Sequence, residues 1–318
     1  MNVFVTAYHN SVNPTLFEDL ASIGLKVYAP DNTWGKRIWF FAPNDPFREH
    51  ATLISYEQFL KLPPLAIIYP CNQHLKDFNQ LYQDRGCRDV KVHLTAQSIT
   101  AYPHDEVEFL LTHDIDFHRL SPARTKMIYF SPPKLYYPQD RDLKRAYDNK
   151  IARLYINNFR KEGFEPEYAA AKEFRKLWLE RGGRGGEFYG YDNENGNLSE
   201  QSVQEHMRDS MFTISFKRRE TMAQVATASM LYGTPLLMLN RFRNNLTKFY
   251  IVTEDNTLIA ETIEELVDKA LNLTFEEYES LSWAARTMAS MYASNEPRRT
   301  HLRWFFGKVD ERLRNGTN

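Results

Sequence analysis

The chain has 318 residues with a formal net charge of −1, and 42% of its residues are apolar. The apolar content excludes a disordered chain. The length suits two domains of roughly 130–170 residues each. The nearly balanced charge produces no overall electrostatic field that would attract nucleic acid. Cys71 and Cys87 are too few for a disulfide framework or a zinc site, so we expect a reducing compartment. Without a long apolar run or a signal-peptide pattern, the sequence predicts a cytoplasmic protein with no transmembrane segment.

The first part of the chain alternates predicted strands and helices. Asn2–Ala7 is the first expected strand, and a helix then begins near Pro14 and ends at Gly24. Further apolar runs predict strands at Leu25–Ala29, Leu65–Tyr69, Val90–Leu94 and Val107–Thr112. Strands joined by helices form a parallel, doubly wound sheet, and we expect this domain to end near Lys126. The opening lacks a G-x-G-x-x-G motif, so no dinucleotide site is expected there.

Two features of this part are candidates for ligand contacts. His9 follows the first strand, at the edge where parallel sheets bind ligands, and is either an acceptor-side residue or an exposed loop histidine. Trp34 belongs to an irregular stretch, Asn32–His50, in which aromatic and basic residues are interleaved. Such a stretch either stacks on bases or sugars or packs on the domain surface. We assign Trp34 to the acceptor side on the first interpretation.

The second part of the chain begins with a stiff, extended crossing at Ser131-Pro132-Pro133. Ala152–Asn157 is an expected strand, and a helix follows from about residue 166 to 179. The glycine-rich segment Gly182–Gly186 is an expected turn before a short strand at Glu187–Tyr189. The other expected helices are one capped by Ser199 and those at Thr262–Leu271, Thr274–Tyr292 and Pro297–Arg314.

The stretch from Asp209 to Asn240 has the pattern of a complete βαβ unit. A β-rich run at Met211–Phe216 is followed by a charged turn at 217–220 and by helical spacing of apolar residues up to Tyr232. Gly233 fits a helix C-cap, and an apolar strand follows at 236–239. In such a unit, the first turn and the helix N-terminus suit a phosphate group.

This stretch resembles the nucleotide-sugar-binding motif of the retaining GT-B glycosyltransferases. Glu220 matches the first glutamate of the motif, and Ser229–Pro235 matches its A-M-A-x-G-x-P segment. Two positions differ: Ala228 replaces a second glutamate that holds the ribose hydroxyls in the family, and Thr221–Ala223 replaces a glycine-rich loop. The order of elements over residues 150–295 also resembles a GT-B second domain.

The resemblance implies a donor site for a UDP-sugar. Glu220 would hold the hydroxyls of the donor sugar as a catalytic residue, and Arg160 with Lys161 would hold the diphosphate. The implied donor-binding residues are Arg160, Lys161, Gly190, Tyr191, Arg219, Glu220, Thr221, Met222 and Ala223. From the residues alone, Glu220 is equally well explained as a complement to the helix dipole, and the basic pair as a solvated pair beside a helix.

The resemblance also bears on the end of the first domain. His113 matches a position at which the family often has a serine or histidine facing the crevice, and it is a second catalytic candidate. Asp114-Ile115-Asp116 resembles the D-x-D metal motif of the other glycosyltransferase fold. The parallel-sheet pattern favours GT-B, whose members usually need no metal, so we expect no metal site and no cofactor other than the UDP-sugar substrate.

We therefore expect an α/β protein of the GT-B fold, with two doubly wound Rossmann-like domains facing across a cleft. Residues 1–128 would form the acceptor domain and 129–296 the nucleotide-sugar domain, with a helix at 297–318 returning toward the first. The expected reaction transfers a sugar, a hexose, from a UDP-sugar to an acceptor hydroxyl. The acceptor is a hydroxymethylated base in duplex DNA, as for viral members of the family, or a glycan, lipid-linked sugar or protein. An inactive GT-B module that binds a nucleotide or partner, and a sugar-phosphate epimerase, are the alternatives.

Overall fold

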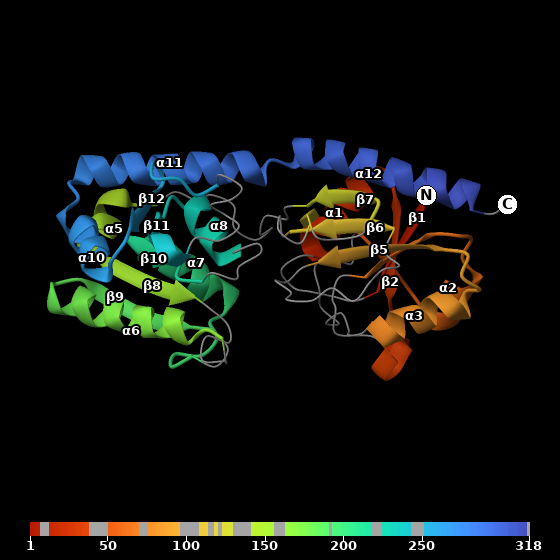
Figure 1. Cartoon of the computed structure of the whole chain (residues 1–318), viewed down its shortest axis with the longest axis horizontal. Helices are drawn as coiled ribbons and strands as arrows, with labels where there is room; N and C mark the ends of the chain where they lie inside the picture. The colour runs from red at the N-terminus through yellow and green to blue at the C-terminus, as the bar shows by residue number, and fades with distance from the viewer. Residues whose placement is uncertain are drawn as a thin grey trace. The chain divides into compact units, whose positions relative to one another are not determined.

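The computed structural model divides the chain into two compact units, which are described separately (Figure 1). Unit 1 contains Met1–Ser131 and Ser294–Asn318, and unit 2 contains Pro132–Ala293. The structure describes residues 1–6, 13–37, 50–69, 75–95, 108–113, 118–119, 123–129, 141–155, 163–190, 193–217, 224–242 and 251–316. The sequence prediction placed the corresponding boundaries after residues 128 and 296.

Unit 1 is built on a parallel sheet of seven strands in the order β3-β2-β1-β4-β5-β6-β7. The strands are β1 (Asn2–Val5), β2 (Lys26–Pro30), β3 (Thr52–Ile54), β4 (Ala66–Tyr69), β5 (Val90–Thr95), β6 (Phe109–Thr112) and β7 (Thr125–Ile128). All four residues of β4, and all four of β6, are buried, because helices cover both faces of such a sheet. The strand order reverses between β1 and β4, so this sheet is doubly wound, as predicted.

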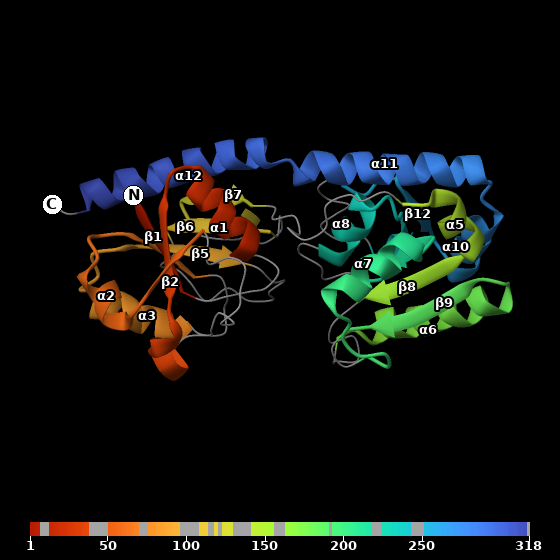
Figure 2. The same ribbon diagram turned by 180° about the vertical axis from the view of Figure 1, so that it is seen from behind.

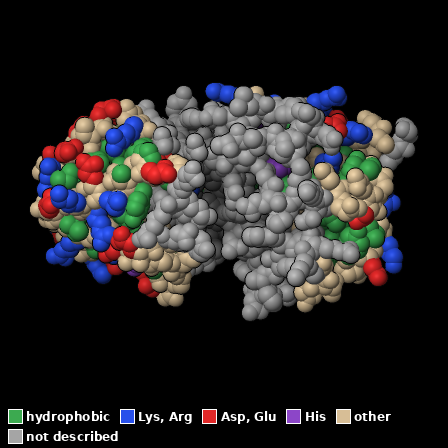
Figure 3. Space-filling view, turned by 60° about the horizontal axis from the view of Figure 1, so that its bottom comes forward, with side chains coloured by type: hydrophobic (Ala, Val, Ile, Leu, Met, Phe, Trp, Pro, Cys, Tyr) green, Lys and Arg blue, Asp and Glu red, His purple; other side chains and the backbone are tan. Residues whose placement is uncertain are grey.

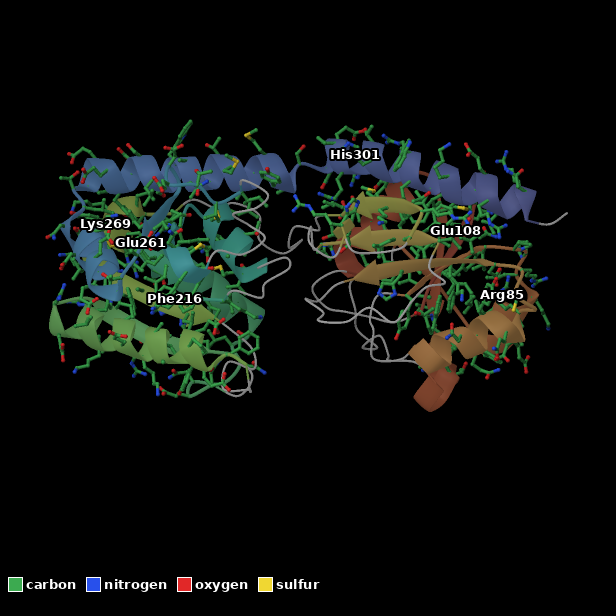
Figure 4. All side chains as sticks on the ribbon, viewed as in Figure 1. Arg85, Glu108, Phe216, Glu261, Lys269 and His301 are labelled. Atoms are coloured by element: carbon green, nitrogen blue, oxygen red, sulfur yellow. The ribbon has the colours of Figure 1, made fainter. Side chains whose placement is uncertain are left out.

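The helices of unit 1 are α1 (Asn13–Ser22), α2 (Tyr56–Lys61), α3 (Leu75–Asp84) and α12 (Asn295–Asn315), with a 3-10 helix η1 (Asn32–Arg37). Ser55 caps α2 in a capping box with Gln58, whose side chain accepts from the Ser55 backbone amide. Just after α3, Arg85, labelled in Figure 4, is buried against Asp89 and donates to the carbonyls of Leu62 and Pro63 in the loop that follows α2. This arginine therefore fixes α2 to the rest of the unit.

Trp34 lies in the core of unit 1. Its side chain is 3% exposed, its Nε1 donates to the carbonyl of Ile54 at 2.6 Å, and its ring stacks on Phe4 with centroids 5.4 Å apart. Phe59 completes this aromatic cluster. The burial corrects our assignment of Trp34 to the acceptor side, because the hydrogen-bonding group and the ring faces are already used within the fold.

The last helix, α12, is held on unit 1 by a buried charge cluster. Asp19 of α1 is 0% exposed and accepts hydrogen bonds from Arg298 Nη2 at 3.0 Å, Arg299 Nε at 3.2 Å and the Tyr129 hydroxyl at 3.1 Å. Arg298 also donates to Asp19 through Nε. Further along the helix, the exposed Arg312 pairs at 3.0 Å with Glu108, which is labelled in Figure 4. The ion pairs with Asp19 join elements from the two ends of the sequence, and the pair with Glu108 joins α12 to the residue before β6.

Unit 2 is built on a parallel sheet of five strands in the order β12-β11-β10-β8-β9. The strands are β8 (Ile151–Tyr155), β9 (Arg184–Tyr189), β10 (Phe212–Ile214), β11 (Leu236–Leu239) and β12 (Thr257–Ala260). Strand β9 corrects our expectation that Gly182–Gly186 is only a turn. Gly185 and Gly186 have φ of +78° and +79° and lie within the strand, at an irregularity in its pairing with β8. A Cβ on Gly185 would meet the carbonyl oxygen of Ala152 at 2.8 Å, so this close approach requires glycine.

The helices of unit 2 are α5 (Leu143–Asn149), α6 (Glu165–Glu180), α7 (Glu200–Asp209), α8 (Gln224–Leu231), α10 (Ile263–Asn272) and α11 (Phe275–Ala293), with a 3-10 helix η4 (Asn240–Phe242). Buried residues of α6 and α10 pack with those of the strands in one core cluster. Helices α7 and α8 pack against each other through Met207, Ala228 and Tyr232 (Figure 2). Ser199 and Thr262 cap α7 and α10, which confirms both predicted helix starts.

Candidate active site

In unit 2, the two strands that precede the predicted diphosphate- and sugar-binding segments are neighbours in the sheet. Strands β8 and β10 are neighbours, paired in parallel with Leu154 opposite Ile214, and the strand order reverses between them. Ligands of doubly wound sheets bind outside the carboxyl ends of the strands at such a reversal. The segment containing Arg160 and Lys161 follows β8, and the segment containing Glu220 follows β10. Both segments therefore start from adjacent strand ends.

Most of the predicted site residues lie outside the described residues. This applies to the donor residues Arg160, Lys161, Tyr191, Arg219, Glu220, Thr221, Met222 and Ala223, to His9, and to Asp114 and Asp116. Gly190, His113 and Trp34 are described, as is Ala228 at the position of the second family glutamate. The geometry of the site is therefore built from the side chains that border these segments.

Strands β8 and β9 each end in a tyrosine. Tyr155 and Tyr189 lie opposite each other in the pairing, with their rings stacked at 5.7 Å between centroids. Burial raises the pKa of both phenols. Gly190 follows with φ of +124° and donates its amide to the Gly196 carbonyl at 2.8 Å. The positive φ of Gly190 means that this turn requires glycine. Because their pKa values are raised, Tyr155 and Tyr189 stay neutral near neutral pH and can act as hydrogen-bonding groups.

Behind the tyrosine pair lies a polar network that the sequence analysis missed. Arg153 of β8 pairs with Glu187 of β9 at 3.5 Å and donates to Ser210 Oγ at 2.9 Å and to the His206 carbonyl at 3.2 Å. The His206 ring lies 5.1 Å from that of Tyr189. Burial, and then the cation of Arg153, lower the pKa of His206. The signal was present in the sequence, because Arg153 and Tyr155 alternate with apolar residues in a strand that parallel sheets normally bury on both faces.

The chain just after β10 contacts α6 and the residue that precedes this helix. Phe216 is fully buried and packs edge-on against Phe174 of α6 at 5.8 Å, which anchors the strand end from which the Glu220 segment departs (Figure 4). The next residue, Lys217, places its Nζ 5.7 Å from the centroid of the Phe164 ring, just before α6. Glu167, in the first turn of α6, is fully buried. Lys217 is thus a cation at the strand reversal, which the sequence analysis treated only as part of a charged turn.

Ala228 occupies the core between α7 and α8. Its side chain is 0% exposed and packs with Met207 and Tyr232. A glutamate at this position would place its carboxylate in an apolar contact rather than against a ligand. Any contact with the ribose hydroxyls must therefore come from another residue of this chain.

In unit 1 the corresponding edge carries His113. This residue follows β6, is 0% exposed, and its ring lies 5.5 Å from that of Tyr129, which follows β7. The Tyr129 hydroxyl in turn donates to Asp19. Thr6, which follows β1 beside the strand reversal of this sheet, is also buried. His113 is thus held at the carboxyl edge of its sheet by packing against Tyr129.

The described residues contain no group of three or more His, Cys, Asp or Glu side chains placed to hold a metal ion. Within the same described ranges, no helix combines the length and the apolar character needed to cross a lipid bilayer.

Comparisons with known proteins identify the fold. No family model matches the chain, and no curated protein matches it by sequence. Among solved structures, the chain is similar to a sucrose-phosphate synthase from Thermosynechococcus elongatus, with a TM-score of 0.61, 15% identity, and coverage of 98% of this chain and 99% of that one. It is also similar to HepE of Anabaena in complex with UDP and glucose, with a TM-score of 0.61, 10% identity, and coverage of 96% and 99%.

A DNA-modifying β-glucosyltransferase, whose structure was determined with and without uridine diphosphoglucose, gives a TM-score of 0.60 at 12% identity and coverage of 98% and 100%. The chain spans about half of TarM, 54% of that chain, at a TM-score of 0.58 and 12% identity. The likeness extends over nearly the full length of the first three structures and includes both parallel sheets. The chain therefore has the GT-B fold, as the sequence predicted.

Proposed function

We propose that the protein is a glycosyltransferase that transfers a sugar, a hexose, from a UDP-sugar to an acceptor hydroxyl. The observation that carries the proposal is the reversal of strand order between β8 and β10, because both predicted donor segments leave the sheet there. Two neighbours of the same fold were solved with UDP and glucose or with uridine diphosphoglucose. Their ligands support a UDP-sugar as donor here.

In this proposal, different residues around the strand reversal bind different parts of the UDP-sugar donor. Arg160 and Lys161 neutralise the diphosphate, together with the backbone amides of 221–223, and Lys217 adds a further cation beside them. Glu220 accepts hydrogen bonds from the sugar hydroxyls. Gly190 and Tyr191 lie beside the nucleobase, and Arg219 completes the donor set.

The transfer breaks the bond between the anomeric carbon and the β-phosphate oxygen, and UDP leaves with the bonding electrons. A new bond forms between the anomeric carbon and the acceptor oxygen, whose proton is lost. The cations around the diphosphate stabilise the charge that develops on UDP, so no metal ion is needed. His113 and His9 are the acceptor-side residues. Because His113 is fully buried beside Tyr129, it takes part only if the acceptor hydroxyl reaches this edge of the sheet.

For the acceptor we propose a hydroxymethylated base in duplex DNA, which would have to leave the base stack to react. The support for this acceptor is the DNA-modifying β-glucosyltransferase, which is one of three neighbours that the chain matches over nearly their full length. Acidic and basic side chains are interspersed over the described surface in Figure 3, so any DNA contact on that face would rest on local groups. An enzyme with this acceptor would act in the cytoplasm, that of the host if the protein is viral.

The experiment supplies radiolabelled UDP-glucose with duplex DNA containing 5-hydroxymethylcytosine, and with unmodified duplex as the control. We expect label in the modified DNA alone, unchanged by EDTA, and binding that weakens steeply with salt. UDP should also raise the melting temperature of the protein. Label in glycans or lipids, with none in DNA, would reject the DNA acceptor but keep the donor site. No stabilisation by any nucleoside diphosphate would reject the donor site itself.

A second candidate is a non-catalytic GT-B module that binds a nucleotide or a partner. Ala228 favours it, because the buried alanine removes the ribose contact made by the family glutamate. UDP binding without transfer of the sugar to DNA, glycan or lipid acceptors, and without hydrolysis of the UDP-sugar, would support this module.

A further inference from the structure

Unit 2 has an open pocket at the edge of its sheet where the strands begin. Its volume is about 460 Å³, and its walls come from α11, the start of α5 and the turn at Gly233. Gly233 follows α8 and precedes β11, so the pocket lies at the opposite edge of the sheet from the predicted donor segments. Neither the donor nor the acceptor of the proposed reaction uses it.

The inner wall of the pocket carries the guanidinium of Arg141, which forms no salt bridge among the described residues. Arg141 donates to the carbonyls of Arg208, Ser210 and Gly233 and to the Tyr278 hydroxyl, which are all neutral acceptors. An arginine has five N–H groups, so these four hydrogen bonds leave one donor. Burial lowers the pKa of Arg141, although its guanidinium stays charged at physiological pH. The pocket is therefore lined by a cation that no carboxylate among the described residues contacts directly, although the charge of Asp209 acts on it from farther away.

The outer wall adds a second cation and a flat apolar surface. Arg286 is exposed and makes no hydrogen bond or ion pair among the described residues. Trp283 is 70% exposed, although it borders a cavity. Glu279 is the acidic residue of the described lining, so two guanidinium groups face one carboxylate. This arrangement favours an anion, and the tryptophan face favours a ring attached to it.

We propose that this pocket binds a small organic anion that combines a phosphate group with a planar ring, of the aryl phosphate class. The phosphate lies between Arg141 and Arg286, and the ring lies against Trp283. The pocket volume is within the range of roughly 300–1,000 Å³ that is usual for sites of small ligands. The proposal does not depend on the proposed transferase activity, because none of its residues belongs to the donor or acceptor set.

The test is calorimetric titration of the full chain with phenyl phosphate, inorganic phosphate and phenol. Phenyl phosphate should bind more tightly than either fragment. Arg286→Gln and Trp283→Ala should each weaken it by at least about threefold, as expected for an exposed ion pair and an aromatic contact. Both side chains are exposed, so the variants should fold. Arg141 is left intact, because it ties three carbonyl groups together.

Two matched controls place the site. Arg184→Gln removes another exposed arginine of unit 2, and Trp304→Ala removes an exposed tryptophan of unit 1, and both should bind phenyl phosphate normally. If inorganic phosphate or phenol bound as tightly as phenyl phosphate, the proposal would be overturned, because the ring or the phosphate group would then contribute nothing to binding. Absence of phenyl phosphate binding, or binding unaffected by both pocket variants, would also overturn it.

Discussion

The charge cluster at Asp19 should contribute strongly to the stability of unit 1, and Asp19→Asn is the most direct perturbation. The substitution keeps the shape of the side chain but removes its charge, while Arg298 stays 7% exposed at its side chain. It leaves a buried guanidinium without its partner, and breaking a buried ion pair in this way costs about 3–5 kcal/mol. At about 2–4 °C per kcal/mol for a unit of this size, the melting temperature should fall by roughly 6–20 °C.

The assay is urea unfolding followed by circular dichroism, with hydrogen exchange to show whether α12 detaches first. The matched control is Arg312→Gln. Arg312 lies on α12, as Arg298 does, and the substitution breaks its pair with Glu108. That pair is exposed, with side chains 46% and 35% accessible, and should contribute no more than about 1 kcal/mol. If Asp19→Asn costs no more than Arg312→Gln, the argument from burial fails. The double variant Asp19→Leu with Arg298→Leu should recover much of the loss, because it leaves no buried charge unpaired.

Three further outcomes follow from unit 2. Glu220→Gln should lower the transfer rate about ten- to a hundredfold with little loss of stability, while Glu200→Gln is silent; a wild-type rate for Glu220→Gln would reject the donor-site assignment. Ala228→Glu should lower the free energy of unfolding by at least about 2 kcal/mol, because the carboxylate enters a 0% exposed position; a stable variant with faster transfer would contradict this. The pKa of His206 is lowered in the folded state, so the unfolded state binds a proton more readily and the free energy of unfolding should fall as the pH drops below about 6.5. His206→Gln should reduce this pH dependence in urea unfolding, and an unchanged dependence would show that His206 does not contribute.

The central strands of both sheets could be predicted from the sequence because they are buried on both faces. The apolar runs at β4, β6 and β11 need no knowledge of their partners to be identified. Strands β3, β7 and β12 were not predicted; they lie at edges of the two sheets and have three or four residues each. An edge strand has one neighbour and a weaker apolar pattern, so its signal is close to that of a loop.

Burial of single side chains was harder to predict than the strands. Trp34 lies in a stretch rich in aromatic and basic residues, and local composition does not distinguish a ring that stacks on a ligand from one that stacks on Phe4. The capping box of α2 was readable, because Ser55 and Gln58 have the spacing that such a box requires, but the sequence analysis did not use it. The distinction for Trp34 depends on the carbonyl of Ile54, whose position is set by the pairing of β3 with β2.

The candidate site depends on strand order, which local sequence patterns do not contain. The segments with Arg160 and Glu220 are recognised separately in the sequence, and each has an ordinary explanation, as a solvated basic pair and as a complement to the helix dipole. If β9 lay between β8 and β10, the two segments would leave the sheet from strands that are not neighbours. The pairing of Leu154 with Ile214 makes these strand ends adjacent, as the proposed donor site requires. Strand order thus makes a shared donor site the more economical explanation of both segments.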